Sequence, residues 1–148
     1  MISLVVTAVI AAFSCQVDAP QSVSIVEGTA KANAIGLPAA SLKFSLSISA
    51  GDPMIAKVEW PGDPMQVAGE VPAISTGPGA YGFSAYSPGP CLFTEKECLT
   101  QVNVVETEDG KAQIILAPIA IARDSNSNRR NPFAVLAAGR CIRTDQTK

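Results

Sequence analysis

The clearest regular pattern along the chain is an alternation of apolar and polar positions within residues 41–50. Every second residue there is apolar, and lysine or serine stands between the apolar positions Leu42, Phe44, Leu46 and Ile48. A period of two places the apolar side chains on one face of a half-buried strand. The tetrapeptide Gly-Asp-Pro-Met follows at 51–54 and returns at 62–65. Because Asp before Pro favours a tight turn, this segment predicts three strands connected as a meander.

A second strong signal lies at the Asp109-Gly110 step. Residues 99–106 and 112–122, which are rich in apolar and β-branched side chains, flank it on either side. An Asp-Gly step between two such runs predicts a β-hairpin.

The segment from Thr76 to Pro90 is dominated by glycine and proline, which predicts a long surface excursion with one short strand. It contains three aromatic residues, Tyr81, Phe83 and Tyr86. On an exposed loop they form a candidate contact surface for a glycan or a protein, since aromatic side chains bury much area at small entropic cost. The alternative is that they plug one end of the folded domain.

The last segment, residues 133–143, fits two structures. Asn131, Pro132 and Gly139 would frame a short helix, whereas Phe133, Val135 and Ala137 alternate as in a strand. The β context favours the strand. We therefore predict an all-β chain in which residues 20–148 form a single antiparallel β-sandwich or small barrel of about seven strands.

An apolar run precedes this predicted domain at residues 2–13, and no charged side chain occurs before Asp18. Its length suits a secretory signal, and the small residues around Ala19 predict cleavage there, with residues 1–19 as the signal peptide. Residues 12–15, Ala-Phe-Ser-Cys, also resemble the lipobox of bacterial lipoproteins, which implies a leader of residues 1–14 and lipidation of Cys15. A buried N-terminal strand is the alternative.

Four cysteines raise the question of disulfide pairing. Removal of the signal, or acylation of Cys15, leaves three, of which Cys91 and Cys98 form the best pair because they close a short loop. Cys141 is an alternative partner for either of them. If all four stay together, three pairings are possible.

The composition removes whole classes of function. The 148 residues include no histidine, which excludes histidine-based catalysis and histidine-containing zinc sites. The formal net charge of −2 gives no electrostatic field strong enough to recruit nucleic acid. We predict no catalytic residues, no metal and no cofactor. A hydrolase that uses paired carboxylates is the enzymatic alternative.

All five arginines fall near the end of the chain, and they form a candidate anion-binding patch: Arg123, Arg129, Arg130, Arg140 and Arg143. The whole pattern predicts a periplasmic or secreted, non-enzymatic binding or structural module of the cell envelope. Its expected partner is a protein or glycan of the envelope, with membrane contact only if Cys15 is acylated. An envelope lipoprotein is the alternative.

Overall fold

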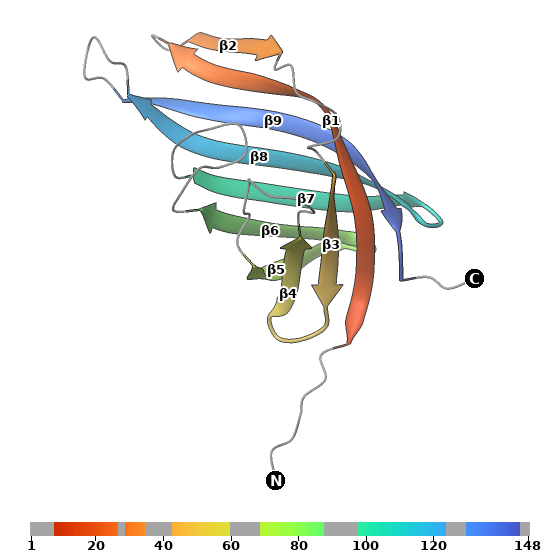
Figure 1. Ribbon diagram of the computed structural model, residues 1–148. Coiled ribbons are helices and arrows are strands. Elements are labelled where there is room, and N and C mark those ends of the chain that lie inside the picture. Colours follow the sequence, from red (N-terminus) through yellow and green to blue (C-terminus); the bar gives the residue numbers. More distant parts are fainter. Residues whose placement is uncertain are drawn as a thin grey trace.

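The structure is a computed structural model that describes residues 8–26, 29–34, 43–59, 69–87, 98–123 and 130–145. These residues form nine β-strands and no helix (Figure 1). The strands are β1 (Val9–Val26), β2 (Thr29–Ala34), β3 (Lys43–Ser49), β4 (Met54–Glu59), β5 (Glu70–Gly77), β6 (Ala80–Ser87), β7 (Cys98–Glu108), β8 (Lys111–Arg123) and β9 (Arg130–Arg143).

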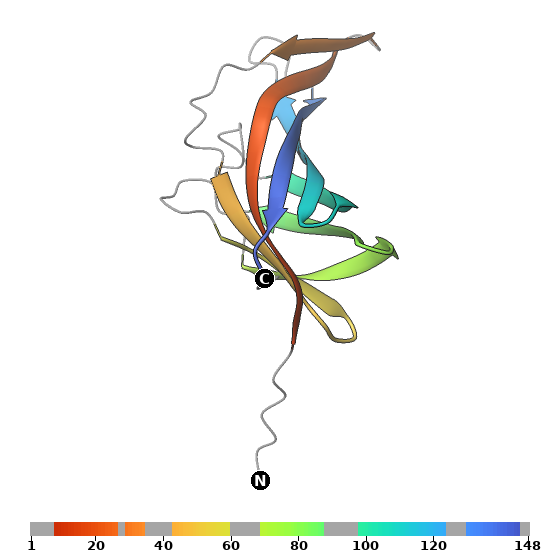
Figure 2. The same cartoon turned by 90° about the vertical axis from the view of Figure 1, so that its right-hand side faces the viewer.

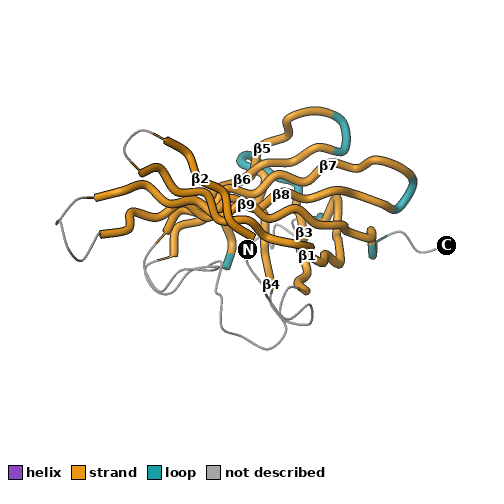
Figure 3. The backbone as a smooth tube through the Cα atoms, turned by 90° about the horizontal axis from the view of Figure 1, so that it is seen from above, coloured by secondary structure: helices purple, strands orange, loops and turns teal. Residues whose placement is uncertain are grey.

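The strands form one antiparallel sheet that closes on itself. From β3 to β9 each strand pairs with the next in chain order, and β1 pairs with both β3 and β9. The strands β1 and β3–β9 thus make a small barrel of eight strands, and β2 adds to the far end of β1 (Figures 1 and 2). Seen from above, the β5–β6 and β7–β8 turns project from one side of the molecule (Figure 3). The predicted all-β class is confirmed, with one more barrel strand than expected.

The core is built by the inward side chains of these strands. In β3 the predicted alternation is confirmed, since Phe44, Leu46 and Ile48 are buried and Lys43 and Ser45 are exposed. The buried set extends round the barrel: Phe13, Val17, Val58, Phe83, Val102, Val104, Ile114, Leu116 and Val135, with several alanines. These side chains fill the interior of the described barrel, as expected for eight strands.

The hairpin predicted at the Asp-Gly step is confirmed. Strands β7 and β8 are joined by a two-residue turn of Asp109 and Gly110. Gly110 has a φ of 72°, a conformation that glycine adopts without the steric cost of a side chain. Lys111 and Glu108 form an exposed ion pair of 2.8 Å across the turn.

The surface excursion predicted for residues 76–90 is wrong for residues 76–87. Here β5 and β6 form a tight hairpin with residues 78 and 79 at its turn. Strand β6 also pairs with β7 along its whole length, from Ala80 opposite Val105 to Ser87 opposite Cys98. Residues 80–83 pair with β5 as well. This pairing stabilises the strand despite the weak strand preference of its glycine and serine residues. Residues 88–90 lie outside the described residues.

The ambiguous last segment is a strand, as the β context favoured. Gly139 lies opposite Val17 where β9 pairs with β1. A Cβ at this position would collide with the carbonyl oxygen of Gln16 and would stand 2.8 Å from the Cα of Val17. The glycine therefore permits the close approach of β1 and β9, rather than ending a helix.

The predicted N-terminal leader largely coincides with β1. The strand continues past Ala19, with a shift of its register against β9 between Asp18 and Gln21. Ala11, Phe13 and Val17 are buried in the core. This is the buried-strand alternative. Cleavage after Ala19 stays a prediction. The cleaved protein would differ from the structure described, because it would lack the half of β1 that pairs with β3.

Candidate functional site

A disulfide bond joins the first and last strands of the barrel. Cys15 of β1 and Cys141 of β9 are direct partners in the strand register, with Cα atoms 4.0 Å apart. Both side chains are only 2% exposed, on the inner face of the sheet. The bond therefore closes the barrel covalently along the β1–β9 seam.

This bond decides part of the cysteine question. Cys141 pairs with Cys15, which rules out the alternative in which Cys141 pairs with Cys91 or Cys98. Cys91 lies outside the described residues and Cys98 begins β7, so the Cys91–Cys98 bond stays a prediction. Of the three ways to pair all four cysteines, the one that contains Cys15–Cys141 also pairs Cys91 with Cys98. Acylation of Cys15 needs a free thiol, and the disulfide and a lipid anchor on this sulfur exclude each other.

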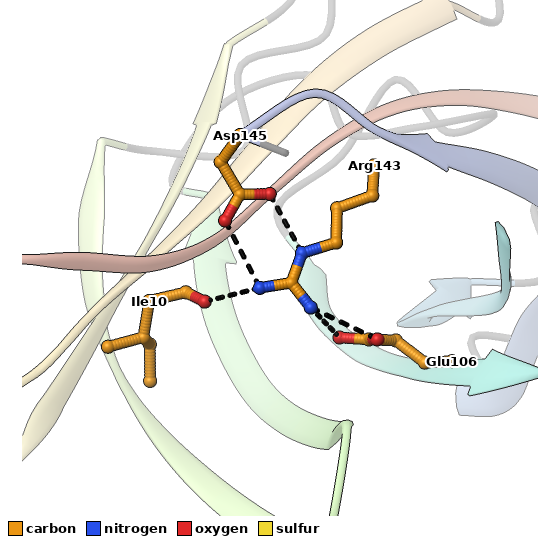
Figure 4. A network of polar contacts seen from close by, with 4 residues as sticks. All are labelled: Ile10, Glu106, Arg143 and Asp145. Atoms are coloured by element: carbon orange, nitrogen blue, oxygen red, sulfur yellow. Dashed lines mark hydrogen bonds and ion pairs between the residues drawn. The ribbon is translucent and has the colours of Figure 1, made fainter. Parts of the chain in front are cut away.

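Two residues after Cys141, Arg143 forms a cluster of polar contacts with Glu106, Asp145 and the backbone of Ile10 at one end of the seam (Figure 4). The guanidinium of Arg143 donates to both carboxylate oxygens of Asp145, at 2.8 and 3.1 Å, and to both of Glu106, at 2.9 and 3.1 Å. It also donates to the carbonyl oxygen of Ile10 at 2.7 Å. Arg143 thus ties together β1, β7 and the residues after β9, and the side chains of Arg143 and Glu106 are only 18% and 23% exposed.

Backbone hydrogen bonds reinforce the same end. The amide of Thr144 donates to the carbonyl of Ala12, and the amide of Arg143 donates to the carbonyl of Gly110, at 2.8 and 2.9 Å. Mutual hydrogen bonding raises the pKa of Arg143 and lowers the pKa of Asp145. A general acid in a hydrolase needs the opposite, a carboxyl pKa raised toward neutrality, so Asp145 acts as a structural anion.

The five arginines do not form one patch. Arg143 points inward to its carboxylate partners, whereas Arg140, three positions earlier on β9, is exposed on the outer face. The backbones of Arg123 and Arg130 lie opposite each other where β8 and β9 meet, and Arg129 lies outside the described residues. The predicted five-residue patch is therefore wrong. A smaller anion site at the β8–β9 tip stays a prediction.

The three aromatic residues of β6 do not share a surface either. Phe83 is only 5% exposed and belongs to the core, and Tyr81 packs against that core. Tyr86 is 56% exposed on the outer face. Residues 81 and 83 share one face of the strand, and residue 86 lies on the other because its spacing from them is odd. The plug alternative holds for Tyr81 and Phe83.

Sequence reasoning missed the most distinctive surface of the molecule. On the outer side of β6–β9, five large apolar side chains, each between 44% and 56% exposed, lie away from the β7–β8 turn: Tyr86, Leu99, Ile115, Ile119 and Leu136. We call these five the apolar face. Two more, Val105 and Ile142, lie closer to that turn. The signal was present in the sequence, because β8 has apolar residues at both parities, whereas a sheet with one solvated side alternates with polar residues.

Other parts of the outer surface differ. On β3–β5 the outward positions include Lys43, Lys57, Glu59 and Glu70, all exposed, and Lys57 pairs with Glu59 at 2.7 Å. Between the five members of the apolar face stand only alanine and uncharged polar residues: Ser84, Gln101, Asn103, Ala117, Ala134 and Ala138. The largest exposed apolar patch on a protein of this size is often functional.

Comparisons with protein-family models, curated proteins and solved structures found no match. Within the described ranges, no group of three or more cysteine, aspartate or glutamate side chains is placed to hold a metal ion. The described strands and turns include no helix long and apolar enough to cross a membrane.

Proposed function

We propose that the protein is an exported, non-enzymatic module of the cell envelope that acts by contact through its outer surface. In this proposal residues 9–26 are retained as β1. The observation that carries it is the buried Cys15–Cys141 bond. Disulfides persist in the periplasm and outside the cell and are rare in the reducing cytosol.

The filled interior supports action through the outer surface. Eight-stranded barrels either fill with side chains or hold one small ligand. Here Phe13, Leu46, Ile48, Ile114 and Leu116 are each at most 1% exposed, so their surfaces are in contact with other protein atoms. The apolar face, on the opposite side of the sheet, supports contact with a partner there.

The test is the location and thiol state of the protein in the cells that make it. Free thiols are alkylated at lysis, before the periplasmic, secreted, membrane and cytosolic fractions are separated. We expect the protein in the periplasmic or secreted fraction, with Cys15 and Cys141 alkylated only after reduction. Cytosolic protein with both thiols alkylated would contradict the proposal. A lipid thioether on Cys15 in the membrane fraction would replace it with the lipoprotein alternative.

A further inference from the structure

The apolar face supports a more specific inference about the partner. It rests on the proposed function only in assuming that the protein acts through this surface. We infer that the apolar face binds a second copy of the chain, so that two β6–β9 sheets pack face to face in a symmetric dimer. In Figure 1 this is the side of β6–β9 directed away from β3 and β4.

The register of the strands makes the face continuous. Tyr86 lies opposite Leu99, and Leu99 lies opposite Ile119, so three neighbouring strands present one apolar row. Ile119 stands opposite Ala134, which places Leu136 diagonally beside it on β9. Ile115 lies on the same side of β8, four residues away. Ile119 therefore lies between Leu99 and Leu136, in the row that also holds Tyr86.

The area suits a dimer of ordinary size. Aromatic side chains bury roughly 150–250 Å² each. At about 150–200 Å² each, since four of the five are leucine or isoleucine, five side chains that are about half exposed present roughly 400–500 Å². A stable interface buries about 800 Å² on each partner, of which roughly 55–65% is apolar. The alanine and uncharged polar residues between the five supply the remainder.

The charge distribution favours a second copy as the occupant. Among the outward residues of β7–β9 whose side chains are described, the charged ones nearest the apolar face are Arg140 and the Lys111–Glu108 pair, toward the β7–β8 turn. At the other end of β8 and β9 the next charged residues are Arg123 and Arg130, which lie opposite each other in the register. A face without charge meets its own copy without opposing like charges, and a charged ligand would gain no complementary contact there. Sheets also pack readily face to face, at a spacing of about 10 Å. A two-fold axis at Ile119 would bring the two apolar rows together.

The test is the molar mass of the full-length protein in solution, by light scattering and sedimentation over roughly 1–200 µM. We expect the wild type to approach twice the chain mass of 15.3 kDa. Ile119→Lys would place an ammonium group from each copy within the interface, and we expect this variant to stay monomeric. Ile74→Lys is the matched control, because Ile74 is 64% exposed on β5 and outside the apolar face. We expect this variant to dimerise like the wild type.

Circular dichroism shows whether each variant is folded, and Ile119→Ser replaces the lysine variant if that one fails to fold. A wild type that stays monomeric, whether or not it captures another protein, overturns the inference. A dimer that survives both substitutions of Ile119 also overturns it. A monomeric wild type with an intact Cys15–Cys141 bond would contradict the dimer but not the proposed function. A dimer found in the cytosol with both cysteines reduced would contradict the proposed function but not the dimer.

Discussion

Reduction of the Cys15–Cys141 bond should remove a large part of the stability of the barrel. The bond joins residues 126 positions apart. In the chain-entropy model a ring of this length restricts the unfolded chain enough to contribute roughly 5 kcal/mol. A bond between Cys91 and Cys98 closes a ring of about eight residues and contributes only about 2.5 kcal/mol by the same relation. The Cys15–Cys141 bond is therefore expected to contribute more to stability than a Cys91–Cys98 bond would.

The assay is urea unfolding followed by far-UV circular dichroism, with and without reductant, in a background in which Cys91 and Cys98 are alanine. With a slope of about 2 kcal/mol per molar urea, a loss of roughly 5 kcal/mol lowers the midpoint by about 2.5 M. The matched control is Val17→Ala, a neighbouring core position on β1. It should cost about 2 kcal/mol whether or not reductant is present, because it removes buried methyl groups and no cross-link.

Complete reduction has to be verified by mass, since both cysteines are buried and react only when the barrel opens. A fully reduced protein whose midpoint moves by less than about 1 M would refute the assignment of this bond as the main constraint. An equal loss in Cys15→Ala/Cys141→Ala without reductant would support it.

Three further predictions follow from the seam and its neighbours. Arg143→Gln should lower the free energy of unfolding by about 2 kcal/mol, because it leaves two carboxylates without their donor, whereas Lys111→Gln, in an exposed ion pair, should change it by less than about 0.5 kcal/mol in the same denaturation assay. Gly139→Ala should lower the free energy of unfolding by about 2 kcal/mol or more through the collision at the seam. In the control Gly82→Ala the new Cβ would meet only side-chain atoms closely, and the cost should be less than about 1 kcal/mol. Equal effects of the two substitutions would argue against an unusually close approach of β1 and β9. Because the pKa of Asp145 is lowered in the folded protein, its contribution to stability is complete above its ordinary pKa of 3.8 and is lost as the pH falls through the lower native value. Asp145→Asn should therefore weaken the fall in the free energy of unfolding at acid pH. An unchanged fall would exclude Asp145 as its cause.

Local pattern was enough to predict the elements whose signals are short in range. The alternation in β3 and the Asp-Gly turn between β7 and β8 each depend on a few consecutive residues. The last strand, β9, was ambiguous for the same reason, because its local signals fit both helix and strand. Its pairing with β1 and β8 and the close approach at Gly139 resolve that ambiguity.

Long-range pairing was not predictable from one sequence. The β1–β9 register brings Cys15 to Cys141 and Arg143 to Glu106, and nothing in the spacing of these residues indicates that they meet. The apolar N-terminal run fits a signal segment and a buried strand equally well, because both need an uncharged stretch of this length. The outward position of Ile119 follows only from the register of β8 against its neighbours.

The most direct test of the account is a disulfide map of the purified, unreduced protein after tryptic digestion and mass spectrometry. The sequence gives no lysine or arginine before Lys31 and places Cys141 between Arg140 and Arg143. We therefore predict that the peptide of residues 1–31, or its N-terminally trimmed form that still contains β1, is linked to the peptide of residues 141–143. A protein that begins at Pro20 would contradict the Cys15–Cys141 seam. One in which Cys15 is a free thiol would contradict both the seam and the function proposed from it.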